Sequence, residues 1–582
     1  MKPILVLAIF SVFAQVINGE EATFGVTDAA YRTAVVNAAD AKAARLRNET
    51  TASLTHRELM RRVKLFAGVV LAPDSALAGD EDTAVVAGQL VAQLAKLQVG
   101  SGLFMGGDNV ESAPDSAFTI NDVADTLELI RCKDSDRVLA DIASALDGIV
   151  RRAIPAMLAG GVHTPNHRWE LAAALARIHR YRPDKRLKRR AEEWLAEGID
   201  IQDDGMYSER SANYAAYVSN PSLTAVADIL GREDLRAIVS QNLQAFIGLI
   251  RPDGTVETVH SRRQDQMDSY FSIAPFITLY RRFAIEMGSG VLAWGAERAL
   301  AGGIVDPETV LFELLMNPQI GWVLPPSVAP IFGRQRWNNS GLLVDANARR
   351  TLVIFGGSDY PRFRRIRSGL SNNPTFLQLS AGRVKLVSAR LSRDFFGLGP
   401  FRADRLDVHD DVITLTEHVA GMYYLPLEQE HRRKDGIYAL EDEGRFAAAM
   451  AFSKRSTEVV GLDTRVDVVL AEDGVEIVIS TKGPRLTWSL ELAFQPGGRF
   501  EGLVPINGGV HQLLSGYGRY VVGDDAIEFG PGNADAPKGF YHPGEDYTYL
   551  GGSDAVDGPR VYLMGRSPGT SRFTLRAVRM AA

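Results

Sequence analysis

The sequence lacks the features that define several common protein classes. Cys132 is the only cysteine in 582 residues, so no internal disulfide can form. Because Cys132 lies in an apolar segment, we expect a buried structural thiol. The net charge of −7 provides no general basic face, which argues against nucleic acid as a partner. There is also no P-loop, no G-x-S-x-G elbow and no H-E-x-x-H motif.

Long hydrophobic runs are missing as well, apart from one at the N-terminus. Lys2 precedes a short apolar run over residues 3–13, and small or polar residues follow, which is typical of a cleaved export signal. The run is too short to cross a bilayer comfortably, and no second run of spanning length occurs. We therefore expect a signal peptide over residues 1–22, a secreted or periplasmic protein, and no membrane span.

The first half of the remaining sequence has a helical period. Hydrophobic residues make up 46% of the chain, which is enough to build large cores. Alanine-rich helical patterns are divided by Gly, Asp and Pro, and the clearest cover residues 84–97, 138–158, 169–181, 235–250 and 271–285. Many helices of ordinary length with short connections predict an N-terminal (α/α) toroid, an incomplete helical barrel, over residues 23–315.

After residue 315 the period changes to two. Predicted strands cover residues 352–355, 376–379, 384–387, 465–470, 475–480, 561–564 and 572–578. Asp473-Gly474, between two of these strands, is a strong hairpin signal. The pattern predicts a C-terminal antiparallel β-sandwich over residues 316–582, and thus a multidomain protein with an α half followed by a β half.

The most informative segment is residues 204–217. If it is helical, Tyr207, Arg210, Tyr214 and Tyr217 fall on one face, because they are spaced by about one turn. Three phenols and a guanidinium need many hydrogen-bond partners, which suits a groove that binds sugars and carboxylates. The alternative is a helix with half-buried tyrosines whose hydroxyls reach water.

A second polar segment opens the predicted helix that runs to Tyr181. Thr164 is a candidate N-cap with Pro165 at the first helical position, which places Asn166 and His167 in the first turn. These two side chains would lie near the rim of a helical barrel, where loops gather. A capping asparagine and a surface histidine are the alternative.

A third polar segment, residues 258–266, follows the turn at Asp253-Gly254. It contains His260, Arg262, Arg263 and Gln264 within five residues. Such a segment is either a solvated loop or a site for a carboxylate, since arginine offers a bidentate fork.

The order of these segments resembles a known family. A toroid, an Asn-His pair at a helix start, a DG-x-Y-x-E-x-S-x-x-Y segment and a β-sandwich are similar to the heparinase II/III-like and alginate-lyase polysaccharide lyases. The resemblance covers nearly the whole chain in architecture, but its motifs cover only a few dozen residues. It implies β-elimination on a uronic-acid polysaccharide such as glucuronan, alginate or an unsulfated glycosaminoglycan.

The resemblance also implies roles for individual residues. Asn166 would neutralise the substrate carboxylate, helped by His167 and Arg210, and Tyr214 would be the acid and also a candidate base. His167 or His260 would be the base for the opposite C5 configuration. The expected substrate-binding residues are Tyr207, Tyr217, Arg262, Arg263, Trp169 and Gln264. We expect Arg210 to lower the pKa of a nearby phenol.

The sequence departs from the family at the strand that often carries a catalytic or zinc-binding histidine. Asn372 and Asn373 stand in the corresponding segment, residues 370–379. We therefore expect no cofactor and a metal-independent site on the helical half, with a structural metal in the sandwich left open, and Tyr423 or Tyr424 as partial substitutes if either reaches the cleft.

Two rival functions remain open at this stage. The first is a glycoside hydrolase on an α/α barrel, for which Asp108, Asp122 or Asp204 would be candidate catalytic carboxylates. The second is a carbohydrate-binding protein without catalytic activity. The expected partner in the leading hypothesis is an anionic polysaccharide, while the oligomeric state is undetermined.

Overall fold

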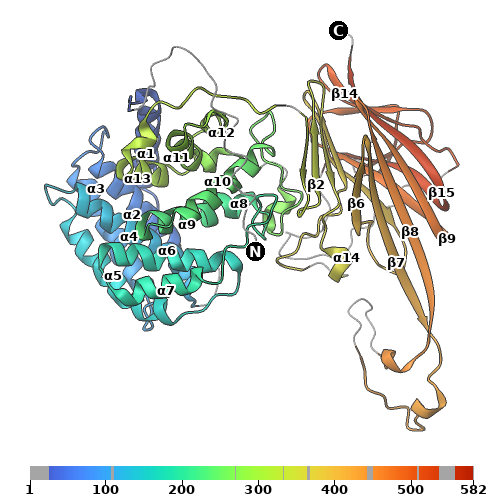
Figure 1. Ribbon diagram of the computed structural model, residues 1–582, viewed down its shortest axis with the longest axis horizontal. Coiled ribbons are helices and arrows are strands. Elements are labelled where there is room, and N and C mark those ends of the chain that lie inside the picture. The colour runs from blue at the N-terminus through green and yellow to red at the C-terminus, as the bar shows by residue number, and fades with distance from the viewer. Residues whose placement is uncertain are drawn as a thin grey trace, which may run out of the picture.

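The structure, a computed structural model, describes residues 25–106, 111–268, 271–331, 333–363, 367–441, 450–507, 510–535 and 558–580. The predicted signal peptide and Asp108 lie outside these residues. Figure 1 shows a helical half followed by a β half, as the sequence predicts. In the described ranges, no helix is long and apolar enough to cross a membrane.

The helical half has one set of helices around an axial cavity and a second set packed around the first. The helices that line the cavity are α2 (His56–Leu71), α4 (Ala113–Lys133), α6 (Pro165–Tyr181), α9 (Asn220–Leu230), α11 (Ile277–Met287) and α13 (Pro307–Met316). The other long helices are α1 (Ala29–Leu46), α3 (Glu81–Leu97), α5 (Ala140–Ala159), α7 (Lys185–Leu195), α10 (Glu233–Ile247) and α12 (Gly290–Ala301). The predicted helix over 271–285 begins later, at Ile277, after a short 3₁₀ turn.

The first turns of the inner helices meet at one end of the toroid. His56 Nε2 at the start of α2 lies 3.3 Å from Asp115 at the start of α4. The rings of Phe118 in α4 and His167 in α6 have centroids 6.3 Å apart. These three helices therefore run in the same direction, and their positive ends face the same side of the molecule.

The β half is built around two long strands. The strands that precede them are β1 (Arg334–Trp337), β2 (Leu342–Ala346), β3 (Thr351–Phe355), β4 (Leu377–Ala381), β5 (Val384–Arg393), β6 (Arg405–His409), β7 (Val412–Tyr424) and β8 (Thr457–Leu470). The others are β9 (Gly474–Phe494), β10 (Arg499–Glu501), β11 (Val504–Asn507), β12 (Val510–Gln512), β13 (Gly518–Val522), β14 (Asp525–Gly530) and β15 (Arg560–Arg579). Apart from β12 with β15, the described pairings are antiparallel.

The long strands β9 and β15 pass from one layer of the sandwich to the other. The first part of β9 pairs with β8 and its last part pairs with β5, while β15 accompanies it along both parts. The predicted strands over 561–564 and 572–578 are therefore parts of one strand. The Asp473-Gly474 hairpin between β8 and β9 forms as predicted.

The first strands of the sandwich are buried on both faces. In β2 and β3, Leu343, Leu352 and Ile354 belong to the core between the sandwich layers. Their neighbours Val344, Val353 and Phe355 belong to the core of the helical half. Successive side chains of a strand point to opposite faces, so the continuous apolar run of β3 is explained by one face in each core.

Cys132 corrects one expectation, because it is exposed rather than buried. It lies in the last turn of α4 between the exposed residues Arg131 and Lys133, one step beyond the buried stripe that ends at Ile130.

Candidate active site

The first turn of α6 has the predicted form. Thr164 has extended backbone angles and Pro165 occupies the first helical position, although the Thr164 side chain does not cap the helix. Asn166 is fully buried and His167 nearly so. The helix start thus points both polar side chains inward, at the end of the toroid where the inner helices begin.

The segment 204–217 is not one helix, so the prediction of a single helical face is wrong. Gly205 and Arg210 have positive φ angles of 80° and 53°, which break a helix before it can start. The helix begins with α8 (Ala212–Tyr214), capped by the Ser211 side chain, and continues as a π-helical turn, η1 (Ala215–Ser219). Tyr207 and Arg210 therefore lie on an irregular chain and do not share a helical face with Tyr214 and Tyr217.

Tyr207 and Trp169 belong to the core, which contradicts their predicted contact with substrate. Tyr207 is 4% exposed and Trp169 is 1% exposed, with ring centroids 5.2 Å apart. The Tyr207 hydroxyl donates to Asn220 Oδ1 at 2.7 Å, and burial raises the pKa of Tyr207 well above its ordinary value. Both rings brace α6 against the segment that carries Tyr214.

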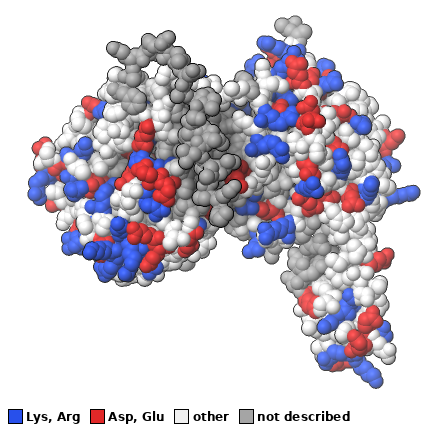
Figure 2. Space-filling view, in the orientation of Figure 1, with Lys and Arg blue, Asp and Glu red and all other residues white. Residues whose placement is uncertain are grey.

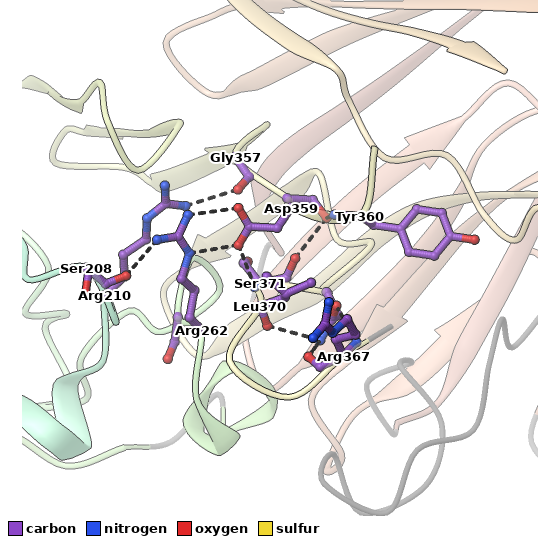
Figure 3. A network of polar contacts seen from close by, with 12 residues as sticks. Ser208, Arg210, Arg262, Gly357, Asp359, Tyr360, Arg367, Leu370 and Ser371 are labelled. Carbon is purple, nitrogen blue, oxygen red and sulfur yellow. Dashed lines mark hydrogen bonds and ion pairs between the residues drawn. The ribbon is translucent and has the colours of Figure 1, made fainter. Parts of the chain in front are cut away.

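Arg210 and Arg262 join the helical half to the β half (Figure 3). Arg210 donates to the carbonyl oxygens of Asn339 at 2.6 Å and Gly357 at 3.1 Å. Arg262 binds both carboxylate oxygens of Asp359 at 2.8 Å. Burial, with the charge of Arg262, lowers the pKa of Arg210 to about 10. These contacts contradict the predicted roles of Arg210 beside a phenol and of Arg262 on substrate, because both guanidinium groups are directed at groups of the protein itself.

The guanidinium that contacts Tyr214 is that of Arg263. Arg263 Nη2 donates to the Tyr214 hydroxyl at 2.5 Å, and its guanidinium carbon lies 4.1 Å from the centre of the ring. The loop reaches this position because Ser211 Oγ donates to Asp265 at 2.9 Å and Arg262 N donates to Glu209 O at 2.9 Å.

Glu209 connects this pair to α6. Its Oε2 accepts a hydrogen bond from Asn166 Nδ2 at 2.6 Å, and its Oε1 lies 3.4 Å from Arg263 Nη1. Burial raises the pKa of Glu209, while Arg263 and Asn166 oppose that effect. Asn166, Glu209, Arg263 and Tyr214 thus form one polar network, which we call the Tyr214 network. Sequence reasoning gave Glu209 no role, although it precedes Tyr214 by five positions in the same motif.

His167 lies beside the Tyr214 network as a neutral ring. Its Nδ1 has no hydrogen-bond partner among the described residues, and its ring meets that of His163 edge-on at 4.8 Å. Burial lowers the pKa of His167 to about 4, so the ring is uncharged at neutral pH and can accept a proton. His163, which the sequence analysis did not single out, is exposed next to it.

His260 is enclosed instead. It is 0% exposed, and within the described part of the chain neither ring nitrogen has a partner. Burial and the charge of Arg210 lower its pKa to about 3. The structure gives His260 no open side toward a ligand, which argues against the predicted role as base.

Strand β4 is preceded by a segment that docks on the loop of residues 258–266. Asn372 N donates to Gln266 Oε1 at 2.8 Å, and Asn373 Nδ2 donates to Gln266 O at 2.9 Å. The two asparagines are therefore used to hold residues 258–266. Tyr423 is 59% exposed on β7, near the hairpin that Figure 1 shows extending away from the helical half, so it does not substitute for them. In the described ranges, no three potential metal ligands among His, Cys, Asp and Glu come together.

Two predicted substrate-binding residues remain accessible. Gln264, at the start of the 3₁₀ turn η2 (Gln264–Met267), is exposed. Tyr217 is 41% exposed and lines the axial cavity, which has a volume of about 280 Å³ and begins beside the Tyr214 network. Figure 2 shows no extended field of one charge on the face in view, apart from basic residues gathered at the lower edge of the toroid, in the region of α7.

Solved structures share this fold. The sequence matches no protein-family model and no curated protein. Heparinase III superposes with a TM-score of 0.54 at 11% identity, over 92% of this chain and 79% of that one. A chondroitin AC lyase from Streptomyces coelicolor, solved with chondroitin sulphate, gives 0.55 at 11% identity over 95% and 80%. A xanthan lyase from Paenibacillus gives 0.54 at 10% identity over 94% and 57%. The chain therefore has the toroid-plus-sandwich fold of polysaccharide lyases.

Proposed function

We propose that this protein is a polysaccharide lyase that cleaves a uronic-acid polysaccharide by β-elimination and leaves a 4,5-unsaturated uronate end. The observation that carries the proposal is the Tyr214 network beside the neutral ring of His167, at the end of a toroid shared with known lyases.

The chemistry requires removal of the C5 proton next to a carboxylate. That proton is barely acidic while the carboxylate keeps its full charge, so donors must stabilise the enolate-like intermediate. Asn166 Nδ2 carries two hydrogens, and Glu209 accepts one of them at 2.6 Å. Glu209 thereby orients the amide. Asn166 is fully buried in this structure, so its second hydrogen would reach the substrate carboxylate only after the first turn of α6 opens toward the ligand.

Proton transfer falls to Tyr214 and His167. A base takes the C5 proton, the C4–O4 bond breaks as the C4–C5 double bond forms, and an acid protonates O4. Tyr214 would supply the proton to O4, and Arg263, whose Nη2 lies 2.5 Å from the hydroxyl, would hold the resulting phenolate by a charge-assisted hydrogen bond. His167 or the Tyr214 phenolate would be the base, depending on the C5 configuration. For His167 the nitrogen would be Nε2, since Nδ1 is buried. Gln264 and Tyr217 are proposed to contact neighbouring sugars.

The hydrolase alternative receives less support. Hydrolysis needs a pair of available carboxyl groups, but Asp122 binds Lys64 at 2.8 Å and Asp204 accepts from Ser340 N at 2.9 Å. Both candidate carboxylates are therefore used within the protein.

A panel of polyuronates separates the three functions. Elimination creates a conjugated double bond that absorbs in the near ultraviolet, whereas hydrolysis creates reducing ends without that absorbance. We expect both signals on at least one polymer. New reducing ends without absorbance would refute the lyase in favour of the hydrolase, and binding with neither signal would favour a carbohydrate-binding protein.

The N-terminal sequence supports export as part of the proposal. A polysaccharide substrate would be met outside the cytoplasm, and residues 1–22 have the pattern of a cleaved signal. Determining the N-terminus of the mature protein in the periplasm or medium would test this, and an uncleaved cytoplasmic chain would contradict it.

A further inference from the structure

One cation that lines the axial cavity, Arg61, has no ion-pair partner among the described residues. Arg57, Arg61 and Lys64 face the cavity from successive turns of α2. Arg57 is paired with Asp115, and Lys64 donates to Asp122 at 2.8 Å. Arg61 is exposed and makes no ion pair with any described residue. The remaining cations of the cavity wall are paired, as Arg57 and Lys64 are. Arg177 and Arg180 bind Asp125, and Arg282 binds Asp228.

Three further groups of the cavity wall suit a sugar. Tyr217 lines the same cavity. Its hydroxyl is hydrogen-bonded to the Asp306 carboxylate, so its ring, which is partly open to solvent, is the part that can meet a sugar. Phe118 lines it as well, with the Arg57 guanidinium 4.1 Å from the centre of its ring. Thr224 Oγ1 is buried in the wall and has no hydrogen-bond partner in the described chain. Buried hydroxyls nearly always have a partner, so one without a partner on a cavity wall marks a place for a ligand group or water.

The proposed catalytic residues do not line this cavity, but they lie next to residues that do. Phe118 meets the His167 ring at 6.3 Å, and Tyr217 follows Tyr214 by three residues on the α8–η1 turn. One helical turn rises by about 5 Å, which is comparable to one sugar ring along a polysaccharide. The axial cavity has a volume of about 280 Å³, which is near the lower end of the range for ligand pockets, roughly 300–1,000 Å³. A cavity of this volume suits one or two sugar units.

We propose that Arg61 forms a second carboxylate-binding subsite, with the Tyr217 ring against the sugar, and that this subsite takes the uronate next to the one being cleaved. This inference rests on the proposed function, because the first carboxylate is the one held by Asn166. A homopolymer of uronic acid carries a carboxylate on every sugar and fills both positions. A glycosaminoglycan alternates uronate with amino sugar and places a neutral ring at Arg61. The subsite therefore selects a homopolyuronate over an unsulfated glycosaminoglycan.

The test is equilibrium binding of three defined oligosaccharides, measured by calorimetry in a Tyr214→Phe background so that turnover does not interfere. The ligands are an oligouronate, a hyaluronan oligosaccharide and a chondroitin sulfate oligosaccharide. Arg61→Gln should raise the Kd for the oligouronate about tenfold, which corresponds to about 1.4 kcal/mol, and leave the Kd for hyaluronan unchanged. Arg61→Lys should keep part of the affinity, since it retains the charge without the fork.

The matched control is Arg189→Gln on α7, which removes the same charge from an exposed side chain whose ion-pair partner is Glu193 at 3.5 Å. An unchanged oligouronate Kd in Arg61→Gln would overturn the inference. An equal loss on hyaluronan would also overturn it, and a loss confined to the sulfated chain would assign a sulfate site instead. The two proposals can also fail separately. If the unmutated protein makes no unsaturated product but oligouronate binding still depends on Arg61, the proposed function is refuted and the subsite is retained.

Discussion

Removal of the Tyr214 hydroxyl should abolish turnover without unfolding the protein. In Tyr214→Phe, Arg263 loses the oxygen that it contacts at 2.5 Å but keeps Glu209 at 3.4 Å. One hydrogen bond is lost and no buried charge is left alone, so the free energy of unfolding should fall by about 1 kcal/mol or less. The proton transfer to O4 disappears entirely, and such transfers typically contribute about 10²–10⁴-fold to the rate.

The assay follows near-ultraviolet absorbance on the best polyuronate, with thermal unfolding and oligosaccharide binding measured on the same samples. We expect kcat to fall by at least about 100-fold while Kd changes little. Tyr423→Phe is the matched control, because the same atom is removed from an exposed ring on β7. Wild-type kcat in Tyr214→Phe would refute the role of this phenol, and a loss of rate in Tyr423→Phe would refute the placement of the site.

Three further predictions concern Asn166 and His167 beside Tyr214, and the Arg262–Asp359 pair that joins the two halves. Asn166→Ala should lower kcat by about 10²–10³ with little change in KM, because the amide acts on developing charge; a rise in KM alone would contradict this. If His167 is the base, kcat/KM should fall as pH drops through about 4, where the ring becomes protonated, and this acid limb should vanish in His167→Gln. The pKa of His167 is about 4 in the folded protein and about 6.5 in the unfolded chain. Below about pH 6.5 the unfolded chain therefore binds a proton that the folded protein does not, so the free energy of unfolding should fall between about pH 6.5 and 4. Asp359→Ala should cost about 2–3 kcal/mol of unfolding free energy through loss of the Arg262 pair, and Arg262→Ala should add little to it in a double-mutant cycle; full additivity would contradict the pairing.

The features that could be predicted from the sequence are those decided by local pattern. The periods of 3.6 and 2 identified the two halves, because each element has to bury its own apolar face. The start of α6 was predicted correctly from Thr164-Pro165, since helix initiation depends on a few adjacent residues.

The errors arose where distant contacts override local pattern. The segment 204–217 has residues that suit a helix, but Gly205 and Arg210 adopt positive φ angles and Arg210 reaches carbonyl groups more than a hundred positions away. In the same way, Arg262 and Arg263 are adjacent in the sequence and serve different partners, Asp359 in one case and Tyr214 in the other. No periodicity distinguishes two neighbouring arginines, because the distinction depends on how the two halves dock.

The two-sided burial of β2 and β3 has a consequence for how the molecule becomes active. Val353 and Phe355 complete the core of the helical half, while Leu352 and Ile354 of the same strand complete the core of the sandwich. Each half would leave part of its hydrophobic core exposed without the other. The two halves should therefore unfold in a single thermal transition rather than in two. The loop that presents Arg263 is held by Asn372 and Asn373 of the β half. Activity should therefore appear late in refolding, only after the C-terminal half has docked.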